Sequence, residues 1–578
     1  MKNFFIQLKD IANSTYFFYY LILLNFFAGI LTFFGFPILI PAIDIITNNE
    51  ISTDNKLVNY ILNLFNTFSI DISFISLCIV GFLLIFLGIL VNFILQIINA
   101  KIHANLTFNY MKKILKLFPK VKWNILLDSK SGDLISAINR ECMAASEVHL
   151  SLLRLVTATI FFGVYILLSF IISNQITSIA VFVFLILFSF NFYFSKKISF
   201  LSNIFHKKFL ELSNFISSFS VNKKVLKSSN RYEKFLNIIV ENKNQMKKYF
   251  LKLNYFEIVA GFIIKILALL FIGFIFINFK FFSITISELL VLMIIFSRLQ
   301  PQFLILSSEY NRFFERLPYY KTIKSRINNF ERNIEISGKK NINTLESIEL
   351  NKLDFVYENR DFSLKNLNYK FIKNTTNIIF GKSGSGKSTV LDLIIGLQKP
   401  ISGKIKINGI NLDDLNIFKF RELISYISQN VTLIDDTIRE NILLFRENCT
   451  DNELKKYIEI CQLDEFIRTL PKGLDTLIGE NGIMVSGGQA QRLALCRSLI
   501  QDCPIIILDE VTSNLDNNNK LKVTEIIKNL SGKKTIIVVT HDIDFAMCAD
   551  NVVIMRDGKF INKYEKPLKK EDILKDIE

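Results

Sequence analysis

The sequence contains few residues of the kinds that build metal and disulfide sites. It has four histidines and seven cysteines in 578 residues, an odd cysteine count, and no Cys-x-x-Cys pair. A disulfide framework, a zinc site and a multi-histidine metal centre are therefore not expected. The same cysteine usage indicates that the bulk of the soluble part lies in a reducing compartment.

Charged residues are also scarce, at 21% of the chain, whereas hydrophobic residues make up 51% and phenylalanine alone occurs 56 times. This composition excludes a disordered chain and argues against an entirely soluble protein. The charge that is present is basic, with 68 Lys and Arg against 52 Asp and Glu and a net charge of +16. A basic surplus can serve nucleic acid, an anionic membrane surface or topology-setting loops, and in so apolar a chain the last two are favoured.

Long apolar stretches predict membrane helices, each of which needs about 20 apolar residues. Five such stretches, the first three without any charged side chain, occur at 11–43, 72–100, 155–195, 258–279 and 282–307. The third is long enough for two spans, which we expect to join near Ser173. Pro37 and Pro41 predict a bend near the end of the first span. The sequence therefore predicts an α-helical bundle of six spans in residues 1–320.

The distribution of lysine and arginine predicts the orientation of these spans. The segment 44–71 contains one basic residue, Lys56, whereas the segments 101–154 and 196–257 contain many. Because basic loops stay on the cytoplasmic side, both long segments and the N-terminus are expected there, and the even number of spans returns the second half of the chain to the cytoplasm. The basic charge is thus explained by topology, and a nucleic-acid partner is not expected.

The two long basic segments have helical character of their own. Apolar residues recur at helical spacing in 108–118 and 209–219. We therefore expect the membrane helices to extend well into the cytoplasm, each pair being closed by a short cross-helix.

A second domain follows a change in composition. Residues 321–346 are rich in Lys, Arg, Glu and Asn and are interpreted as a linker. From 347 to 578, short apolar runs such as 377–380, 505–508 and 536–539 alternate with helical stretches. This alternation is typical of an α/β nucleotide-binding domain.

The segment 381–389, GKSGSGKST, fits the phosphate-binding pattern G-x-x-x-x-G-K-[ST]. It follows a predicted strand and precedes a predicted helix, which is the context that this loop requires. Lys387 would reach the β- and γ-phosphates of a nucleotide and Ser388 would hold Mg²⁺. A plain Gly/Ser-rich turn does not account for this context. The residues assigned to ATP binding in this loop are Gly381, Ser383, Gly384, Ser385, Gly386, Lys387, Ser388 and Thr389.

Two further segments support the same chemistry. The strand-like run 505–508 ends in Asp509 and Glu510, where Asp509 could bind Mg²⁺ through water and Glu510 could polarise an attacking water. The segment 485–489, VSGGQ, opens an amphipathic helix whose start would expose N–H groups to an anion. Alone, the carboxylates could be surface acids and SGGQ a capping turn. A second phosphate-binding helix start beside a P-loop suggests a site that a partner chain completes.

These motifs, in this order, resemble the nucleotide-binding domain of ATP-binding cassette (ABC) transporters over residues 347–561. The whole chain resembles an exporter-type half-transporter, with six spans followed by the cassette. The resemblance implies that Val485, Ser486, Gly487, Gly488 and Gln489 form a signature that acts on the partner's nucleotide. It further implies these roles: adenine stacking for Tyr357, Mg²⁺ sensing and coupling for Gln429, coupling for Glu480, dimer communication for Asp516, and γ-phosphate contact for His541. Two positions depart from the family pattern, Val485 in place of Leu and Asp542 in place of Arg.

The resemblance implies ATP-driven export, or outward flipping, of a lipid, lipid-linked glycan, peptide or drug-like compound, with ATP and Mg²⁺ as cofactors. Because Glu510, Ser486, Gly488 and His541 are all present, both sites of a homodimer would be competent. A non-transporting ATP-dependent membrane regulator is the alternative. The abundance of Lys, Asn, Ile and Phe and the lack of a targeting segment favour a bacterial cytoplasmic membrane.

Ionisable residues inside the spans are candidate cargo contacts. We hypothesise that Arg298, with Lys265, offers positive charge to an anionic cargo. The alternative is that Lys265 reaches the cytoplasmic interface and that Arg298 pairs within the bundle.

Overall fold

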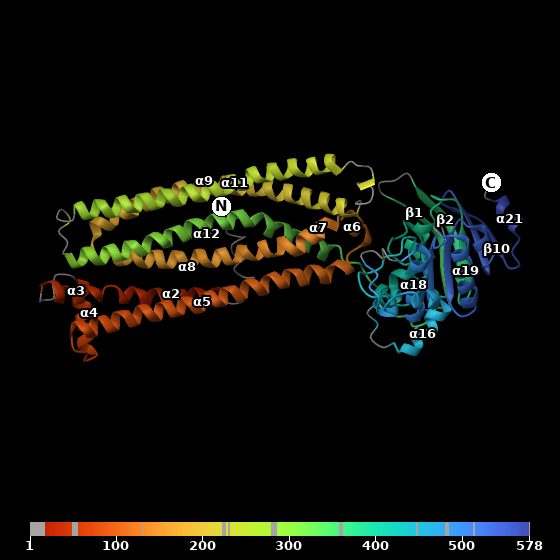
Figure 1. The fold of residues 1–578 in the computed structure, drawn as a ribbon, viewed down its shortest axis with the longest axis horizontal. Helices are drawn as coiled ribbons and strands as arrows, with labels where there is room; N and C mark the ends of the chain where they lie inside the picture. The colour runs from red at the N-terminus through yellow and green to blue at the C-terminus, as the bar shows by residue number, and fades with distance from the viewer. Residues whose placement is uncertain are drawn as a thin grey trace. The chain divides into compact units, whose positions relative to one another are not determined.

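The structure is a computed structural model with two compact units (Figure 1). It describes residues 18–48, 56–129, 131–221, 227–228, 232–278, 282, 286–357, 362–444, 446, 449–479, 485–512 and 515–576. The first unit is Met1–Val121 with Ile125–Ile334, and the second is Glu335–Glu578 with Lys122–Asn124.

The first unit is helical. Its principal helices are α2 (Phe18–Gly35), α5 (Phe74–Leu117), α8 (Cys142–Ile172), α9 (Asn174–Val221), α11 (Tyr232–Ile277) and α12 (Ile286–Arg332). Shorter helices are α3 (Leu39–Asn48), α4 (Lys56–Thr67), α6 (Trp123–Asp128) and α7 (Ser131–Ser136), and the single turns η1 (Phe118–Lys120) and η2 (Ala137–Glu141) complete the unit. Within the described residues, four helices are long and apolar enough to cross a membrane, in α5, α8, α11 and α12. Two shorter apolar helices, Tyr19–Leu31 and Asn174–Ser189, lie where the other two spans are predicted.

The breaks between helices lie where the sequence predicts them. Helix α8 ends at Ile172 and α9 begins at Asn174, with Ser173 in extended conformation between them. Helix α2 ends at Gly35 and α3 begins at Leu39, so Pro37 lies in the break. Pro41 lies in the first turn of α3, where its missing N–H removes no helical hydrogen bond. Both predicted breaks are confirmed.

The helical extensions are also observed. Helix α5 continues through the expected segment 108–118 to Leu117, and α6 follows it as a short helix before α7 and α8. The second expected cross-helix falls largely on residues outside the described ranges. Helix α12 continues to Arg332, so residues 321–332 are helical, although the composition assigns them to the linker. The boundary between the two units lies at Ile334 and Glu335.

The second unit contains two sheets. A four-stranded sheet has the order β2-β1-β4-β5, and a six-stranded sheet has the order β10-β9-β3-β8-β7-β6. Their strands are β1 (Ser347–Val356), β2 (Ser363–Ile372), β3 (Thr376–Phe380), β4 (Ser402–Ile407), β5 (Ile410–Asn411), β6 (Ile424–Ile427), β7 (Ile505–Asp509), β8 (Thr535–Thr540), β9 (Asn551–Arg556) and β10 (Lys559–Glu565). Strands β6, β7, β8, β3 and β9 are parallel. The three central strands, β3, β8 and β7, are fully buried, which explains the apolar runs that form most of each strand.

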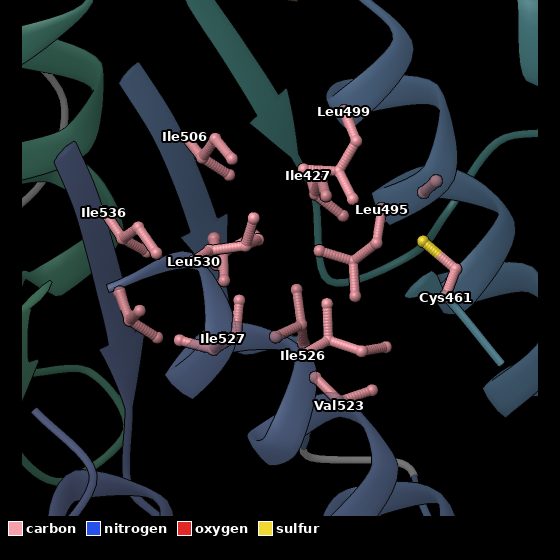
Figure 2. Close-up of a cluster of buried hydrophobic side chains, with 14 of the residues drawn as sticks. Ile427, Cys461, Leu495, Leu499, Ile506, Val523, Ile526, Ile527, Leu530 and Ile536 are labelled. Carbon is pink, nitrogen blue, oxygen red and sulfur yellow. The ribbon is translucent and has the colours of Figure 1, made fainter. Parts of the chain in front are cut away.

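Helices cover the six-stranded sheet. They are α13 (Lys387–Ile394), α14 (Ile417–Arg421), α15 (Ile438–Leu443), α16 (Asp451–Ile460), α17 (Asp464–Arg468), α18 (Gly487–Ile500), α19 (Asn517–Leu530), α20 (Ile543–Ala546) and α21 (Lys570–Lys575), with the single turns η4 (Leu412–Asp414) and η5 (Gly473–Asp475). Figure 2 shows Ile506 and Ile536 of the sheet facing apolar side chains of α18 and α19, among them Leu495 and Ile527. This packing holds the start of α18 in place and aligns the carboxyl ends of the parallel strands, where the functional residues lie.

Candidate nucleotide-binding site

The predicted phosphate loop has the expected strand–loop–helix geometry. Strand β3 ends at Phe380 and α13 begins at Lys387. Gly384 and Gly386 have φ values of +83° and +105°, a conformation that residues with a Cβ rarely adopt. A Cβ at Gly386 would also lie 2.5 Å from the ring of Phe362. Glycine is therefore required at this position both for conformation and for space.

The amine of Lys387 is buried and held over the loop. Its Nζ donates hydrogen bonds to the carbonyl oxygens of Gly381 and Lys382, at 3.0 Å each, and lies 3.4 Å from Glu510 Oε1. Only 4% of the side chain is exposed. A buried cation aimed at the loop is the group that a phosphate chain requires for charge neutralisation.

Asp509 ends the buried strand β7 and accepts two hydrogen bonds. Ser388 Oγ donates to Oδ1 and the Tyr426 hydroxyl donates to Oδ2, each at 3.0 Å. Burial raises the pKa of Asp509, and the two hydrogen bonds offset this shift only in part. Burial, with a smaller contribution from the charge of Asp509, raises the pKa of Asp392 to about 6. A cation bound at this end of β7 would therefore favour the ionised form of the carboxyl groups of Asp509 and Asp392.

The carboxylate of Glu510 brings together three of the other predicted residues. Gln429 Nε2 donates to Oε2 at 3.1 Å, while Lys387 Nζ and His541 Nδ1 lie 3.4 and 3.7 Å from Oε1. The backbone of Glu510 has φ +48°, which is unusual for a residue with a side chain, and its N–H donates to the carbonyl of Val539 at 2.9 Å. Unfavourable backbone conformations of this kind occur often at functional sites.

A cleft of about 430 Å³ connects these groups to two aromatic rings. Its lining includes Tyr357, Phe362, Ser388, Gln429 and Glu510. The ring of Tyr357 packs edge-on against Phe355, with 4.8 Å between the ring centroids, and its hydroxyl lies 3.5 Å from Thr389 Oγ1. The cleft therefore has a polar end at the loop and an aromatic end, which suits a nucleotide with its phosphates and its base.

Three residues of the site were not assigned from the sequence. Tyr426 holds Asp509, Asp392 adds a second buried carboxyl group, and Phe362 lines the cleft below Gly386. Phe362 could have been proposed as a second aromatic residue close after Tyr357. Tyr426 and Asp392 carry no local signal, because only the folding of the sheet brings them to the end of β7.

The segment 485–489 begins α18 but does not line the cleft within the described residues. Ser486 accepts a hydrogen bond from the N–H of Gln489 at 3.3 Å, and the Gln489 side chain accepts one from the N–H of Ser486 at 2.8 Å. This is a capping box. A Cβ at Gly488 would lie 2.6 Å from the Asn519 side chain, so glycine permits close packing on α19.

The other predicted residues lie apart from this cleft or outside the described ranges. Asp516 precedes α19 and accepts a hydrogen bond from Asn519, and Glu480 is not among the described residues. Asp542 accepts hydrogen bonds from the N–H groups of Asp544 and Phe545 at the start of α20 and forms an ion pair with Lys520 at 2.9 Å. An aspartate thus has a local capping role at this position.

Lys265 and Arg298 belong to α11 and α12, and both are exposed. Within the described part of the chain, neither side chain forms an ion pair with another residue.

Comparison with known proteins identifies the cassette and the fold. Residues 364–513 match a family model described as ABC transporter. Over 230 residues the chain is 36% identical to the ATP-dependent lipid A-core flippase of Pectobacterium atrosepticum, covering 39% of this chain and 40% of the relative. Over 213 residues it is 37% identical to the mitochondrial iron–sulfur clusters transporter ATM1 of Kluyveromyces lactis, covering 36% of this chain and 30% of the relative.

The match to a solved structure extends over nearly the whole chain. A bacterial Atm1-family ABC exporter with ATP bound has a TM-score of 0.76 and 18% identity, covering 96% of this chain and 95% of that chain. The matches to curated relatives span 40% of their length or less. The expected ABC cassette and the expected fold class are therefore confirmed: an ABC-type cassette follows a helical unit with an exporter fold.

Proposed function

We propose that this chain, which joins an ABC nucleotide-binding cassette to the helical unit of an exporter fold, hydrolyses ATP to export an amphipathic substrate. In this proposal the helical unit lies in the cytoplasmic membrane of a bacterium and the cassette lies in the cytoplasm. The observation that carries the proposal is the convergence of Lys387, Gln429 and His541 on the carboxylate of Glu510. Beside a phosphate loop, this arrangement suits cleavage of the γ-phosphate of ATP.

Magnesium fits the oxygen atoms at the end of β7. The Ser388 hydroxyl lies 3.0 Å from the Asp509 carboxylate, and the amide of Gln429 lies at the same cleft. Hydroxyl, carboxylate and amide oxygens are the ligand types that Mg²⁺ prefers. Ser388, Gln429 and Asp509 would therefore hold the ion, Asp509 through water, and the bound ion would neutralise charge on the β- and γ-phosphates.

The residues around the γ-phosphate have separate tasks in this account. Lys387 exchanges its loop carbonyl partners for phosphate oxygens, and Glu510 polarises the attacking water. His541 contacts the γ-phosphate, and Tyr357 stacks on the adenine ring. Loss of the γ-phosphate removes these contacts, which biases the cassettes toward the open arrangement.

A second copy of the chain completes each site in this proposal. The start of α18 offers N–H groups to an anion, yet within the described residues 485–489 line no part of their own chain's cleft. We infer that Val485–Gln489 cover the γ-phosphate bound to the other copy, that Asp516 communicates across this seam, and that Glu480 contacts the cross-helices. Two ATP molecules would thus join two cassettes.

The substrate in this proposal is a lipid, a lipid-linked glycan, a peptide or a drug-like compound. Arg298 and Lys265 would offer positive charge to an anionic cargo, and both side chains are exposed. A charged residue inside an apolar span is costly unless it faces a cavity or a ligand.

Reconstitution tests the proposed function. The full chain is placed in sealed proteoliposomes, and movement of a fluorescent phospholipid, a labelled lipid-linked glycan and a labelled peptide is measured with and without Mg-ATP. We expect ATP-dependent movement in at least one arm and none in the matched variant Glu510→Gln, which keeps the side-chain size but removes the charge. ATP hydrolysis without movement in any arm would favour the membrane regulator. Absence of hydrolysis by the unmodified chain would refute the proposal.

A further inference from the structure

Two arginines from different helices share one carboxylate in the helical unit. Arg154 of α8 and Arg312 of α12 each donate through Nη1 to Oε1 of Glu309, at 3.2 and 3.1 Å. The Glu309 side chain is 6% exposed, whereas the side chains of Arg154 and Arg312 are 47% and 50% exposed. A nearly buried acid thus anchors two arginines whose outer parts are accessible.

The charges of this group do not balance. Each guanidinium has five N–H donors in a planar fork, and within the described residues each of these two uses one nitrogen on Glu309. The nearby Arg316 has two acidic partners of its own, because its Nε lies 3.0 Å from Glu147 and its Nη2 lies 3.8 Å from Glu315, so that group carries one excess negative charge. Arg154, Arg312 and Glu309 carry one excess positive charge among themselves, which the Arg316 group offsets nearby, and within the described residues the two arginines keep several N–H donors that Glu309 does not use.

The position of the three residues places this charge at the end of the apolar spans. Arg154 immediately precedes the apolar stretch that begins at residue 155, and Arg312 follows the stretch that ends at residue 307. Helices α8 and α12 pack side by side (Figure 1). From the distribution of basic residues, this end is the cytoplasmic one, at the level of lipid head groups.

A purely stabilising role explains this arrangement poorly. Half-exposed ion pairs contribute little to stability, about 0–1 kcal/mol as a rule. One arginine would be enough to neutralise Glu309, and a second cation on the same oxygen adds repulsion between the two guanidinium groups. Half-exposed guanidinium groups that keep unused N–H donors are instead the groups with which proteins bind phosphate through two parallel hydrogen bonds.

The exposed surface of α12 continues this site along the helix. Arg298, Ile305 and Arg312 follow one another at seven-residue spacing, which places them on one face of a helix. All three are exposed, Ile305 to 40%. Arg298 lies about 21 Å from Arg312 along the helix axis, at about 1.5 Å per residue. This face therefore has an exposed arginine at each end and the exposed Ile305 between them.

We propose that Arg154 and Arg312, positioned by Glu309, form an entry site for an amphiphile that carries a phosphate-type head group. The proposal rests on the proposed export function and specifies its substrate class. The two guanidinium groups bind the head group at the cytoplasmic membrane surface, and the apolar face of α12 beyond them contacts the chain of the amphiphile. Glu309 is a positioning residue that also competes with the ligand for both arginines.

Binding of dodecyl phosphate to the full chain tests this site directly. The chain is placed in nanodiscs of a phosphate-free galactolipid without nucleotide, and the dissociation constant is measured for the unmodified protein and for Arg154→Gln/Arg312→Gln. We expect binding to weaken about tenfold for each arginine replaced, as for loss of a charge-assisted hydrogen bond. The matched control is Lys196→Gln/Lys197→Gln, which removes the same charge from exposed positions of α9 and should leave binding unchanged. Equal weakening by both double variants would contradict the proposal.

Glu309→Gln separates a binding role from a structural one. If Glu309 competes with the ligand, the variant should bind dodecyl phosphate about tenfold more tightly, because both arginines lose their anionic partner. If the three residues serve only to hold α8 and α12 together, Glu309→Gln should lower the melting temperature and weaken binding as the arginine variants do. That second result would overturn the proposal.

Two further measurements show which kind of anion binds and distinguish failure of this site from failure of the proposed function. Inorganic phosphate that binds as tightly as dodecyl phosphate indicates a soluble anion, whereas binding of dodecyl phosphate alone indicates a lipid head group. Uncharged dodecyl maltoside should bind equally to all variants.

ATP hydrolysis is measured on the same samples of unmodified protein. Hydrolysis with no arginine-dependent binding refutes only this site, whereas absence of hydrolysis refutes the proposed function.

Discussion

At the residue scale, buried carboxyl groups beside the phosphate loop make the cassette sensitive to pH. The pKa of Asp392 is raised to about 6, first by burial and then by the charge of Asp509. In an unfolded chain an aspartate has a pKa near 3.9. Because the folded state holds this proton more tightly, the stability from Asp392 is fully present below about pH 4 and is lost as the pH rises through about 6.

Asp392→Asn should remove this pH dependence, since asparagine does not ionise. We expect the variant to be more stable than the unmodified chain above pH 6, by about 1–3 kcal/mol, with the difference shrinking toward pH 4.5. Calorimetric melting of the nucleotide-free full chain, between pH 4.5 and values above pH 6, measures this difference in stability. Asp557→Asn, at a side chain that is 96% exposed, is the control for removing one carboxylate from the protein surface. A stability difference for Asp392→Asn that stays constant across this pH range would contradict the assignment.

Sequence reasoning found residues that belong to a local pattern and missed those that depend on the tertiary fold. Lys387 and Ser388 lie in a contiguous loop motif, and the structure brings Gln429 and His541 to Glu510. Tyr426 has no local signal, because its role depends on β6 pairing with β7. The partnership of Arg154 with Glu309 joins residues far apart in the chain and is equally invisible in the sequence.

At the scale of elements, helices α2 and α5 cross closely through two glycines. A Cβ on Gly35 would lie 2.6 Å from Ile85 Cγ1 and 3.2 Å from the carbonyl oxygen of Gly81. In membrane bundles, small residues of this kind let two backbones approach and pack. The crossing lies just before the break at Pro37, so the glycines and the proline together set the path of the first span.

Gly35→Ala should therefore weaken the crossing of α2 and α5. The added methyl group must displace Ile85, and overpacking of this kind costs about 1–3 kcal/mol. Gly163→Ala is the matched control, since a Cβ there meets no atom within 4 Å and alanine favours a helix over glycine. We expect the melting temperature in detergent to fall for Gly35→Ala and to hold or rise for Gly163→Ala. Equal effects would show that the two helices do not depend on this contact.

The elements themselves were largely predictable. The central strands appear as short, mainly apolar runs because they are buried on both faces, and the spans appear as long apolar stretches, the first three of them without charge. The end of α12 was harder to predict, because residues 321–332 are polar and charged and yet remain helical to Arg332. Composition separates a linker from an apolar span, but it does not separate a linker from a solvated helix end.

At the scale of the whole molecule, a helical unit with apolar spans precedes an ATP-binding cassette, and the order of the two units agrees with the sequence prediction. The cassette contains the loop, the carboxylates and the histidine of one nucleotide site, while its α18 begins away from that cleft. Within the described residues, the segment 485–489 lines no part of this cleft, which is the reason for proposing that two copies pair. From the residues of one sequence, the pairing of two copies is indicated only by the SGGQ segment, which suggests a site that a partner chain completes.

Nucleotide trapping in Glu510→Gln tests this central claim most directly. The purified variant is incubated with Mg-ATP, and the bound nucleotide and the distance between the cassettes of two copies are measured by spin labels. Because the variant binds ATP but cannot polarise water, we predict two trapped ATP molecules per pair of chains and closed cassettes. Cassettes that stay apart, with no retained nucleotide, would contradict the account.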